Sequence, residues 1–485
     1  MKNSNALKNI LLSSVILTSG LLAQANPRTV MVHLFEWKWN DIARECETYL
    51  GPNGFAAIQV SPPNEHAVVT GRPWYERYQP VSYILNSRSG NREEFINMVK
   101  ACKKAGVDIY VDAVINHMTG TLAHGEERVG ISGSRFGRFA YPDYSYDDFH
   151  HCGRNGNDQI SNYGDRYEVQ NCALVGLADL NIEKDYVRDR IARYLNELVD
   201  IGVAGFRIDA AKHMSTNSLN EIIKRVKGNA YIYQEVIDQG GEPIQAKEYF
   251  NNGDVTEFKY SVDMSRVMLN GKLTWLNDKA QFGEGWNYMP SDKAVVFIDN
   301  HDNQRGHGGG GHILNYKDGR NYELASVLML AWPYGYPQVM SSFAFTDPNS
   351  SPPADSEGNT KDTNCLSRAE GPGAQDGWVC EHRWPMIREM VKFRNVTSSK
   401  FYLSNWWSNG NNQIAFSRGD LGFVVINHEE QVLRQRLQTG LTAGVYCDVL
   451  SQNCERTITV NDNGEAEIIV TGQNAAAIHA QSKLK

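Results

Sequence analysis

The sequence predicts an α/β protein: a (β/α)8 TIM barrel with a small domain inserted after its third strand and an antiparallel β-sandwich at its C-terminus. Short β-branched runs alternate with amphipathic stretches from Thr29 to about Arg394, which is the pattern of parallel strands linked by crossover helices. One long interruption follows the third run, and only short alternating strands follow Phe393. At 485 residues the chain is also too long for a single core.

Eight runs are expected to form the barrel strands, since eight βα units close into a barrel. They are residues 30–35, 56–60, 108–115, 205–209, 231–235, 254–258, 294–299 and 337–341. Apolar residues recur three or four positions apart between these runs, which predicts helices. The clearest are residues 92–105, 186–201, 219–226 and 322–330.

Two segments lie outside the alternation. Residues 117–185 are rich in Gly, Asp, Tyr and Asn, and a segment of this length needs a structure or a function of its own. Alternating strands at residues 413–417, 422–427, 444–448 and 466–470 indicate the β-sandwich. The predicted parts are a signal peptide at 1–25, the barrel at 26–116 and 186–395, the inserted domain at 117–185 and the sandwich at 396–485.

The N-terminus has the features of a secretion signal. Lys2 and Lys8 precede a mostly apolar stretch at residues 10–22, and Ala23-Gln24-Ala25 has the small-x-small form cut by signal peptidase. The alternative is a membrane anchor, but the stretch is shorter than the ~20 residues needed to cross a bilayer. We therefore expect a secreted protein without a membrane partner.

The cysteines agree with export, because an even number behind a signal peptide is expected to form disulfides. Three neighbouring pairs suggest themselves, and the fourth is left by elimination. They are Cys152–Cys172, Cys365–Cys380, Cys447–Cys454 and, last, Cys46–Cys102. A zinc site at His150-His151-Cys152 is the weaker alternative, since no CxxC spacing accompanies it.

The charge of the chain argues against nucleic acid as a partner. Its formal net charge is -8, and no Lys/Arg run is dense enough to follow a phosphate backbone. A neutral or small substrate is favoured.

Three acidic residues stand at the ends of different expected strands. Asp209, Glu235 and Asp302 follow the fourth, fifth and seventh runs, and the carboxyl ends of barrel strands hold the active site. Any one of them alone would more often be a helix cap. Together they supply what glycoside cleavage requires, a carboxylate nucleophile, a carboxylic acid and a further stabilising charge.

The motifs around these acids resemble the four signature regions of the α-amylases of glycoside hydrolase family 13. The matching segments are residues 112–117, 205–209, Glu235 and 300–302. Four further sequence segments resemble those of the branch shared by animal and some bacterial amylases, the chloride-type amylases. These segments are residues 33–37, 78–83, 202–209 and 301–307. The resemblance runs from about residue 28 to the C-terminus.

The resemblance implies a secreted, monomeric endo-α-amylase that cuts internal α-1,4-glucosidic bonds of starch, glycogen and maltooligosaccharides with retention. Asp209 would be the nucleophile, Glu235 the general acid and then base, and Asp302 the residue that holds the sugar hydroxyls. Glu242 would lie on the leaving-group side. The expected substrate contacts are Trp74, Tyr75, Tyr78, Gln79, His117, Arg207, Lys212, His213, His301 and His307.

A calcium ion is implied by the same resemblance. Its ligands would be Asn116, Asp179 and the main-chain carbonyls of Gln170 and His213, and oxygen ligands suit this hard cation. Read alone, Asp179 would more simply be a helix cap.

A chloride ion is implied in the chloride-dependent branch, where Arg207 and Asn300 would hold it together with a basic residue near the last strand. Gln338 stands at that third place. Because a neutral amide does not offset the charge of an anion, the sequence predicts activity that needs no chloride.

Two rival functions remain open at this point. A transglycosylase or debranching enzyme could use the same acids, because they do not determine the acceptor. A noncatalytic glucan-binding protein could share the barrel, although it would not need all three carboxylates.

Overall fold

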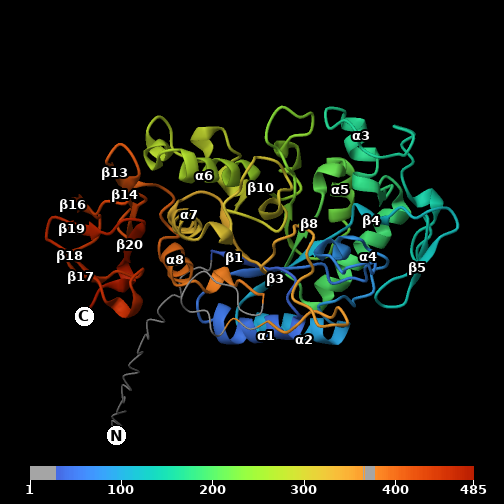
Figure 1. Ribbon diagram of the computed structural model, residues 1–485, viewed down its shortest axis with the longest axis horizontal. Coiled ribbons are helices and arrows are strands. Elements are labelled where there is room, and N and C mark those ends of the chain that lie inside the picture. Colours follow the sequence, from blue (N-terminus) through green and yellow to red (C-terminus); the bar gives the residue numbers. More distant parts are fainter. Residues whose placement is uncertain (1–28, 364, 366–376) are drawn as a thin grey trace, which may run out of the picture.

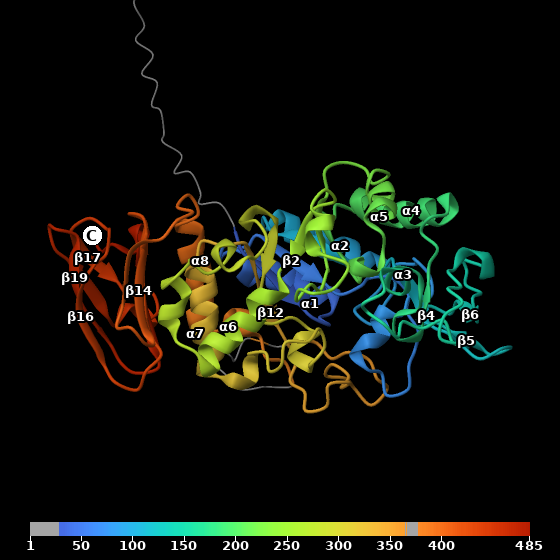
Figure 2. The same ribbon diagram turned by 90° about the horizontal axis from the view of Figure 1, so that it is seen from above.

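The computed structural model describes residues 29–363, 365 and 377–485. Figure 1 shows three parts in a row, with the C-terminal strands at the left, the barrel in the middle and the segment inserted after β3 (Asp108–Ala113) at the right. The view from above in Figure 2 gives the same order. The predicted signal peptide, residues 1–25, lies outside the described residues.

The predicted barrel is confirmed. Eight parallel strands close in the order β1-β12-β11-β10-β9-β8-β3-β2. Besides β3 they are β1 (Met31–Leu34), β2 (Ala57–Val60), β8 (Gly205–Ile208), β9 (Tyr231–Gln234), β10 (Asp254–Thr256), β11 (Ala294–Val296) and β12 (Tyr336–Ser341). The surrounding helices are α1 (Trp39–Glu45), α2 (Arg92–Lys104), α4 (Asp185–Ile201), α5 (Thr216–Ile223), α6 (Phe258–Asn270), α7 (Arg320–Ala331) and α8 (Pro385–Val396).

Local sequence sets where these elements begin and end. The α2 helix starts at a capping box, in which the Asn91 side chain accepts the N–H of Glu94 and Glu94 accepts the N–H of Asn91. The α4 helix ends at Gly202, which has φ 115°, a conformation that favours glycine. β1, β2 and β8 are buried along their whole length, as expected for parallel strands covered on both faces.

Some expected boundaries were wrong by a few residues, including the run 108–115, which ends as a strand at Ala113. The run 294–299 ends as a strand at Val296, since the Asn300 side chain accepts the N–H of Asp302 and turns the chain. The run 254–258 ends at Thr256, because Glu257 caps α6. The helix expected at 219–226 spans 216–223, since Ser215 caps it earlier.

The inserted segment folds beside the end of β3. β4 (His117–Gly120) pairs with β7 (Leu177–Asp179), and β5 (Glu127–Val129) pairs with β6 (Arg135–Gly137). The short helix α3 (Arg166–Asn171) lies between β6 and β7 in the chain. Because His117 lies opposite Asp179, the segment returns to the barrel next to the point where it left.

The C-terminal part consists of two four-stranded antiparallel sheets, as predicted. One contains β13 (Ser404–Ser408), β14 (Gln413–Arg418), β15 (Gly422–Asn427) and β20 (Asn474–His479). The other contains β16 (Leu433–Gln438), β19 (Glu465–Val470), β18 (Thr457–Val460) and β17 (Gly444–Cys447). Four of these strands were predicted, and β13, β16, β18 and β20 were missed. Buried Phe423 and Val425 pack with Leu433 and Ile468 in one core.

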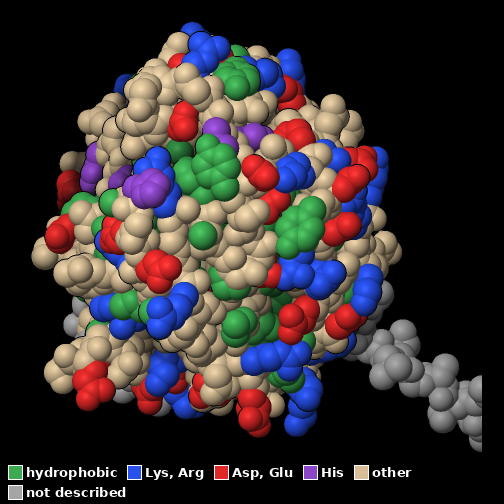
Figure 3. Space-filling model, turned by 90° about the vertical axis from the view of Figure 1, so that its right-hand side faces the viewer, with side chains coloured by type: hydrophobic (Ala, Val, Ile, Leu, Met, Phe, Trp, Pro, Cys, Tyr) green, Lys and Arg blue, Asp and Glu red, His purple; other side chains and the backbone are tan. Residues whose placement is uncertain are grey.

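All four predicted disulfides are present. Cys152 is bonded to Cys172, and the described residues hold no group of three or more His, Cys, Asp or Glu side chains suited to a metal ion. The zinc alternative thus has no support there. No helix in the described part is long and apolar enough to span a bilayer. On the face in Figure 3, acidic and basic side chains are interspersed.

One buried arginine joins the sandwich to the barrel. Arg418, at the end of β14, is 1% exposed. Its guanidinium donates to the carbonyls of Ala331 (2.7 Å), at the end of α7, and Thr397 (3.2 Å), just after α8. It also donates to Lys400 O at 2.8 Å through Nε. Since helix C-termini carry partial negative charge, two helix ends stabilise this cation.

We expect Arg418→Met to lower the free energy of unfolding by about 3 kcal/mol, because it leaves several buried carbonyls without donors. Denaturant unfolding of the purified protein measures this. The control is Arg434→Met, since Arg434 is exposed and paired with Glu467 on the outer sheet and such pairs contribute little. Equal stability of the two variants would contradict the role assigned to Arg418.

Candidate active site

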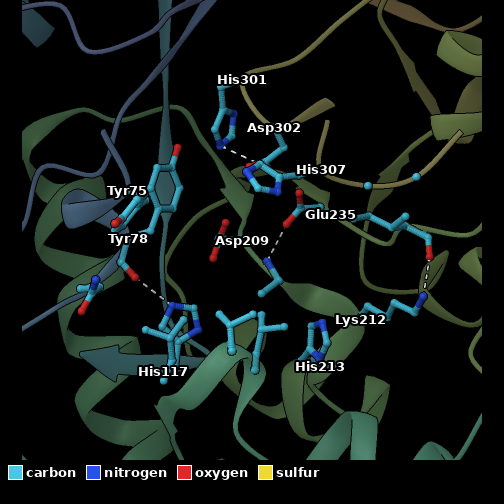
Figure 4. Close-up of a pocket in the computed structure, with 18 of the residues that line it drawn as sticks. Tyr75, Tyr78, His117, Asp209, Lys212, His213, Glu235, His301, Asp302 and His307 are labelled. Carbon is cyan, nitrogen blue, oxygen red and sulfur yellow. Dashed lines mark hydrogen bonds and ion pairs between the residues drawn. The ribbon is translucent and has the colours of Figure 1, made fainter. Parts of the chain in front are cut away.

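The three predicted carboxylates converge on one cavity. Asp209 directly follows β8, Glu235 directly follows β9, and Asp302 lies beyond the end of β11. All three line a cavity of about 830 Å³, and Figure 4 shows them pointing toward the same space. They lie at the carboxyl end of the barrel, as its architecture requires for a catalytic site.

A single guanidinium holds two of these acids. Arg207 Nη1 lies 2.8 Å from Asp209 Oδ1 and 2.6 Å from Asp112 Oδ1, and Arg207 Nη2 lies 2.7 Å from Glu235 Oε1. Asp112 lies opposite Arg207 in the pairing of β3 with β8. Asp209 and Glu235 are therefore kept within the reach of one guanidinium.

Burial and charge shift the ionisation of the group. Burial by itself would lower the pKa of Arg207, but Asp112, Glu235 and Asp209 raise it well above its usual value. Burial, and then the charge of Glu235, raise the pKa of Asp302 to about 7. The cluster has more carboxylates than cations, which favours a developing positive charge on a bound sugar.

A strained turn orients Glu235. Ala210 has φ 49°, a left-handed conformation that is uncommon for residues with a Cβ. This turn directs the Ala210 N–H at Glu235 Oε2, 2.9 Å away. Because such strain is found mainly at functional sites, the turn after Asp209 also serves to hold the neighbouring acid.

Nine of the ten expected substrate contacts line the cavity. They are Trp74, Tyr75, Tyr78, Gln79, His117, Lys212, His213, His301 and His307. Arg207 is the exception: it is 3% exposed and lies beneath Asp209 and Glu235. Its guanidinium contacts the acids rather than the cavity.

The cavity has an aromatic wall and a charged wall (Figure 4). On one side the Tyr78 and His301 rings are stacked, with centroids 5.1 Å apart, and His117 Nε2 lies 2.9 Å from the Tyr78 carbonyl. Burial lowers the pKa of His117 to about 4, so its ring is neutral near pH 7. On the other side Lys212 forms an ion pair with Glu242.

Several lining residues were not predicted. They are Gly120, Tyr163, Leu174, Val175, Leu177, Ala210, Ile237, Gln239, Gly308, Gly309 and Asn349. Gly308 and Gly309 belong to a glycine run that the sequence marks as a loop. Tyr163 and Val175 reach the cavity only through the path of the inserted segment. Asp112 could have been found, because it begins the matched motif at residues 112–117. Strand alternation places its side chain on the same face as that of Val114, two residues later.

Two of the four predicted calcium ligands, Asn116 and Asp179, are in direct contact. Asn116 Nδ2 lies 3.2 Å from Asp179 Oδ1, and turning the amide by 180° would present its oxygen instead. Burial raises the pKa of Asp179 to about 6 although His150 is bonded to it. A buried carboxylate beside an amide oxygen suits a hard cation.

The other two predicted ligands belong to the inserted segment and the barrel. His213 Nδ1 is 2.9 Å from Val169 O, next to Gln170 in α3. The main-chain carbonyls of Gln170 and His213 would add two further oxygen ligands. The donor set therefore fits calcium in its chemistry, and it includes both the segment and the barrel.

The residues expected around chloride do not fit an anion. Arg207 Nη1 is hydrogen-bonded to Asp209 and Asp112, and Nη2 lies 2.7 Å from Glu235 Oε1 as an ion pair, so carboxylates already surround this cation. Gln338 Nε2 donates to Gln59 Oε1 at 2.8 Å, and Gln59 donates in turn to Asp112 at 3.1 Å. The amide of Gln338 is thus part of a neutral hydrogen-bonded chain inside the barrel.

Comparisons with known proteins agree with this architecture. The family model for the α-amylase catalytic domain matches residues 48–288, and the model for the α-amylase C-terminal all-beta domain matches residues 406–481. Pancreatic alpha-amylase 2a5 of Mus musculus is 48% identical over 500 residues, covering 94% of this chain and 95% of its own length.

Two further relatives extend the comparison. Alpha-amylase 2B of Homo sapiens is 48% identical over 495 residues, covering 94% of this chain and 95% of its own. The structure of wild-type alpha-amylase I from Eisenia fetida matches with a TM-score of 0.88 and 43% identity, over 94% of this chain and 98% of that one. On sequence and structure together, the chain belongs to the α-amylase family.

Proposed function

We propose that this protein is a secreted endo-acting α-amylase, which hydrolyses internal α-1,4-glucosidic bonds of starch, glycogen and maltooligosaccharides with retention. The observation that carries the proposal is the pairing of Asp209 and Glu235 on one guanidinium, at a cavity that Asp302 also lines. The Eisenia fetida α-amylase has also been solved as a glutamate-to-glutamine variant with maltohexaose.

Asp209 and Glu235 would act in two displacements. In the first, an Asp209 oxygen bonds to the anomeric carbon while Glu235 protonates the departing glycosidic oxygen. In the second, Glu235 takes a proton from water, and the water oxygen displaces Asp209. The anomeric carbon is inverted twice, so the configuration is retained.

The other polar residues would bind and position the sugar. Asp302 would hold the 2- and 3-hydroxyls and stabilise the positive charge of the transition state. His301 would donate a hydrogen bond to the same ring, and Tyr78 would supply a stacking face. His117, expected from the sequence to donate as well, gives its Nε2–H to the Tyr78 carbonyl in this structure, so it would reach the sugar only after that bond is exchanged. Trp74 and Tyr75, whose rings are 5.8 Å apart, would support neighbouring glucose units.

Calcium would be held by Asn116, Asp179 and the carbonyls of Gln170 and His213. As an ion it would supply charge that ties oxygen atoms of the inserted segment to the barrel. His117, a predicted substrate contact, directly follows Asn116. The ion would therefore steady one side of the cavity. The four disulfides support an extracellular location, and we propose a monomer.

We expect Glu235→Gln and Asp209→Asn each to lower kcat on a maltooligosaccharide by about 10³-fold, because each removes a group that reacts with the bond. Reducing-sugar release at matched protein concentration measures this, with melting temperature as the folding check. Exposed Glu357 gives the control variant Glu357→Gln, which should retain full activity. Wild-type protein no more active than Glu235→Gln would indicate a noncatalytic glucan-binding protein.

The products from linear amylose separate hydrolysis from glucosyl transfer. An endo-acting hydrolase should produce a range of shorter linear oligosaccharides early in the reaction. Cyclic or lengthened products would indicate a transglycosylase instead.

We expect removal of calcium with a chelator to lower the melting temperature, since an ion that binds only the folded state stabilises it by about 2.7 kcal/mol at 100 times Kd. Asp179→Asn should weaken the recovery on adding calcium. Asp147→Asn, at an exposed position of the same segment, should recover like the wild type. A melting temperature that chelation leaves unchanged would contradict a stabilising calcium site.

We expect turnover to persist after exhaustive halide removal, because Gln338 brings no positive charge to the position beside Arg207. Initial rates on starch in halide-free buffer, compared with the same buffer containing NaCl, measure this. A collapse that NaCl reverses would refute the prediction.

A further inference from the structure

A buried arginine beside the active site is enclosed by aromatic rings. Arg305 follows Asp302 by three residues and is 6% exposed. Four rings surround its guanidinium carbon at centroid distances between 4.3 and 5.4 Å. They belong to Phe35, Trp74, Phe343 and Phe345.

Aromatic faces take the place of a carboxylate partner for Arg305. Among the described residues its Nε and Nη2 have no hydrogen-bond partner, and none of the ion pairs found there includes it. The negative face of an aromatic ring attracts a cation, most strongly where water is excluded. Burial lowers the pKa of Arg305 only to about 10, so the side chain is charged at neutral pH.

Within the described part of the chain, this guanidinium makes one hydrogen bond, which goes to the active-site backbone. Arg305 Nη1 donates to the carbonyl of His301 at 2.7 Å. That carbonyl belongs to the peptide group whose N–H is that of Asp302, which donates to Asn300 Oδ1 at 3.0 Å. Arg305 and Asn300 therefore hold the two ends of the peptide group that joins His301 to Asp302.

One ring of the aromatic cage, Trp74, is also part of the cavity wall. Trp74 contacts Arg305 within the cage and lines the cavity next to His301, with ring centroids 5.5 Å apart. Its indole N–H donates to Pro348 O at 2.8 Å, which fixes the ring. Arg305 thus contacts the Trp74 ring and the peptide group that joins His301 to Asp302, both from outside the cavity.

We propose that Arg305 is a positioning residue for the proposed glycosidase reaction, which holds His301, Asp302 and Trp74 in their catalytic arrangement and supplies a positive charge behind Asp302. The inference rests on the proposed function. It assigns a role to a residue that does not line the cavity.

The charge of Arg305 is one of several influences on the pKa of Asp302. Burial and then Glu235 raise the pKa of Asp302, Arg207 lowers it, Asp112 raises it and Arg305 lowers it. His301 Nε2 lies 3.3 Å from Asp302 Oδ2, and Tyr78 is close enough to feel the same charge. Asp302 must be ionised to stabilise a cationic transition state, so activity falls as the pH drops through its pKa. Removing Arg305 raises the pKa of Asp302. The acidic limb of the curve of activity against pH then moves to higher pH.

The test compares Arg305→Met with Arg305→Lys. Met fills similar space without charge, and we expect kcat at neutral pH to fall by about 10²-fold, since a small displacement of catalytic groups has this effect. The acidic limb of kcat/KM should move upward by several tenths of a pH unit. Lys keeps the charge but not the planar fork, so its kcat should fall while its acidic limb stays in place.

A matched control removes another cation from the same cage. Lys317 Nζ lies 3.6 Å from the Phe345 ring centroid, but Lys317 is exposed and does not line the cavity. Lys317→Met should have the kcat and pH profile of the wild type. A loss of activity in Lys317→Met equal to that in Arg305→Met would overturn the proposal, because the cage alone would then account for the effect.

The remaining outcomes are also decisive. A folded Arg305→Met with wild-type kcat and acidic limb overturns the inference while the proposed function stands. If Arg305→Met does not fold, Arg305→Lys decides, and wild-type kcat in that variant overturns the proposal. An inactive wild type overturns the proposed function instead, which separates the two failures.

Discussion

The ion cluster around Arg207 is the interaction on which the rest of the active site depends. A guanidinium buried at the centre of a barrel would be unstable without charged partners, and Asp112, Asp209 and Glu235 supply them from three adjacent strand ends. Because one planar group pairs with all three carboxylates, the register of these strands also sets the separation of Asp209 and Glu235. Any change in the register of β3, β8 and β9 would separate the acids.

Three buried arginines of this molecule show three ways of satisfying the same charge. Arg207 is bonded to carboxylates, Arg305 is enclosed by aromatic rings, and Arg418 is bonded to carbonyls at the ends of two helices. The partners of each arginine match the place of that arginine in the fold. Carboxylates are present where Arg207 lies beneath the cavity, rings where Arg305 packs behind Trp74, and carbonyls where Arg418 joins the sandwich to the barrel. A lysine, with a compact and strongly hydrated ammonium, would suit none of these sites equally well.

Much of the fold could be predicted from the sequence, since β-branched runs and amphipathic periods are local signals. The run at 205–209 and the helix at 92–105 were found within one residue. The strand β16 was missed because most of its residues are polar and exposed, and it is held by pairing with β19. The strand β18 has only four residues and is held mainly by pairing with β17. The acids were predicted because strand order places them at one end of the barrel. Arg305 was not, because its cage contains rings from distant segments that no spacing brings together.

The chain of amides inside the barrel bears on the charge balance of the site. Gln338 is linked through Gln59 to Asp112, which is paired with Arg207, so the hydrogen-bonding capacity of this side of the guanidinium is already used by neutral and acidic partners. Arg207 is also paired with Asp209 and Glu235, so an anion placed beside it would compete with two carboxylates for the same cation. The network around Arg207 therefore keeps Asp209 and Glu235 on one support.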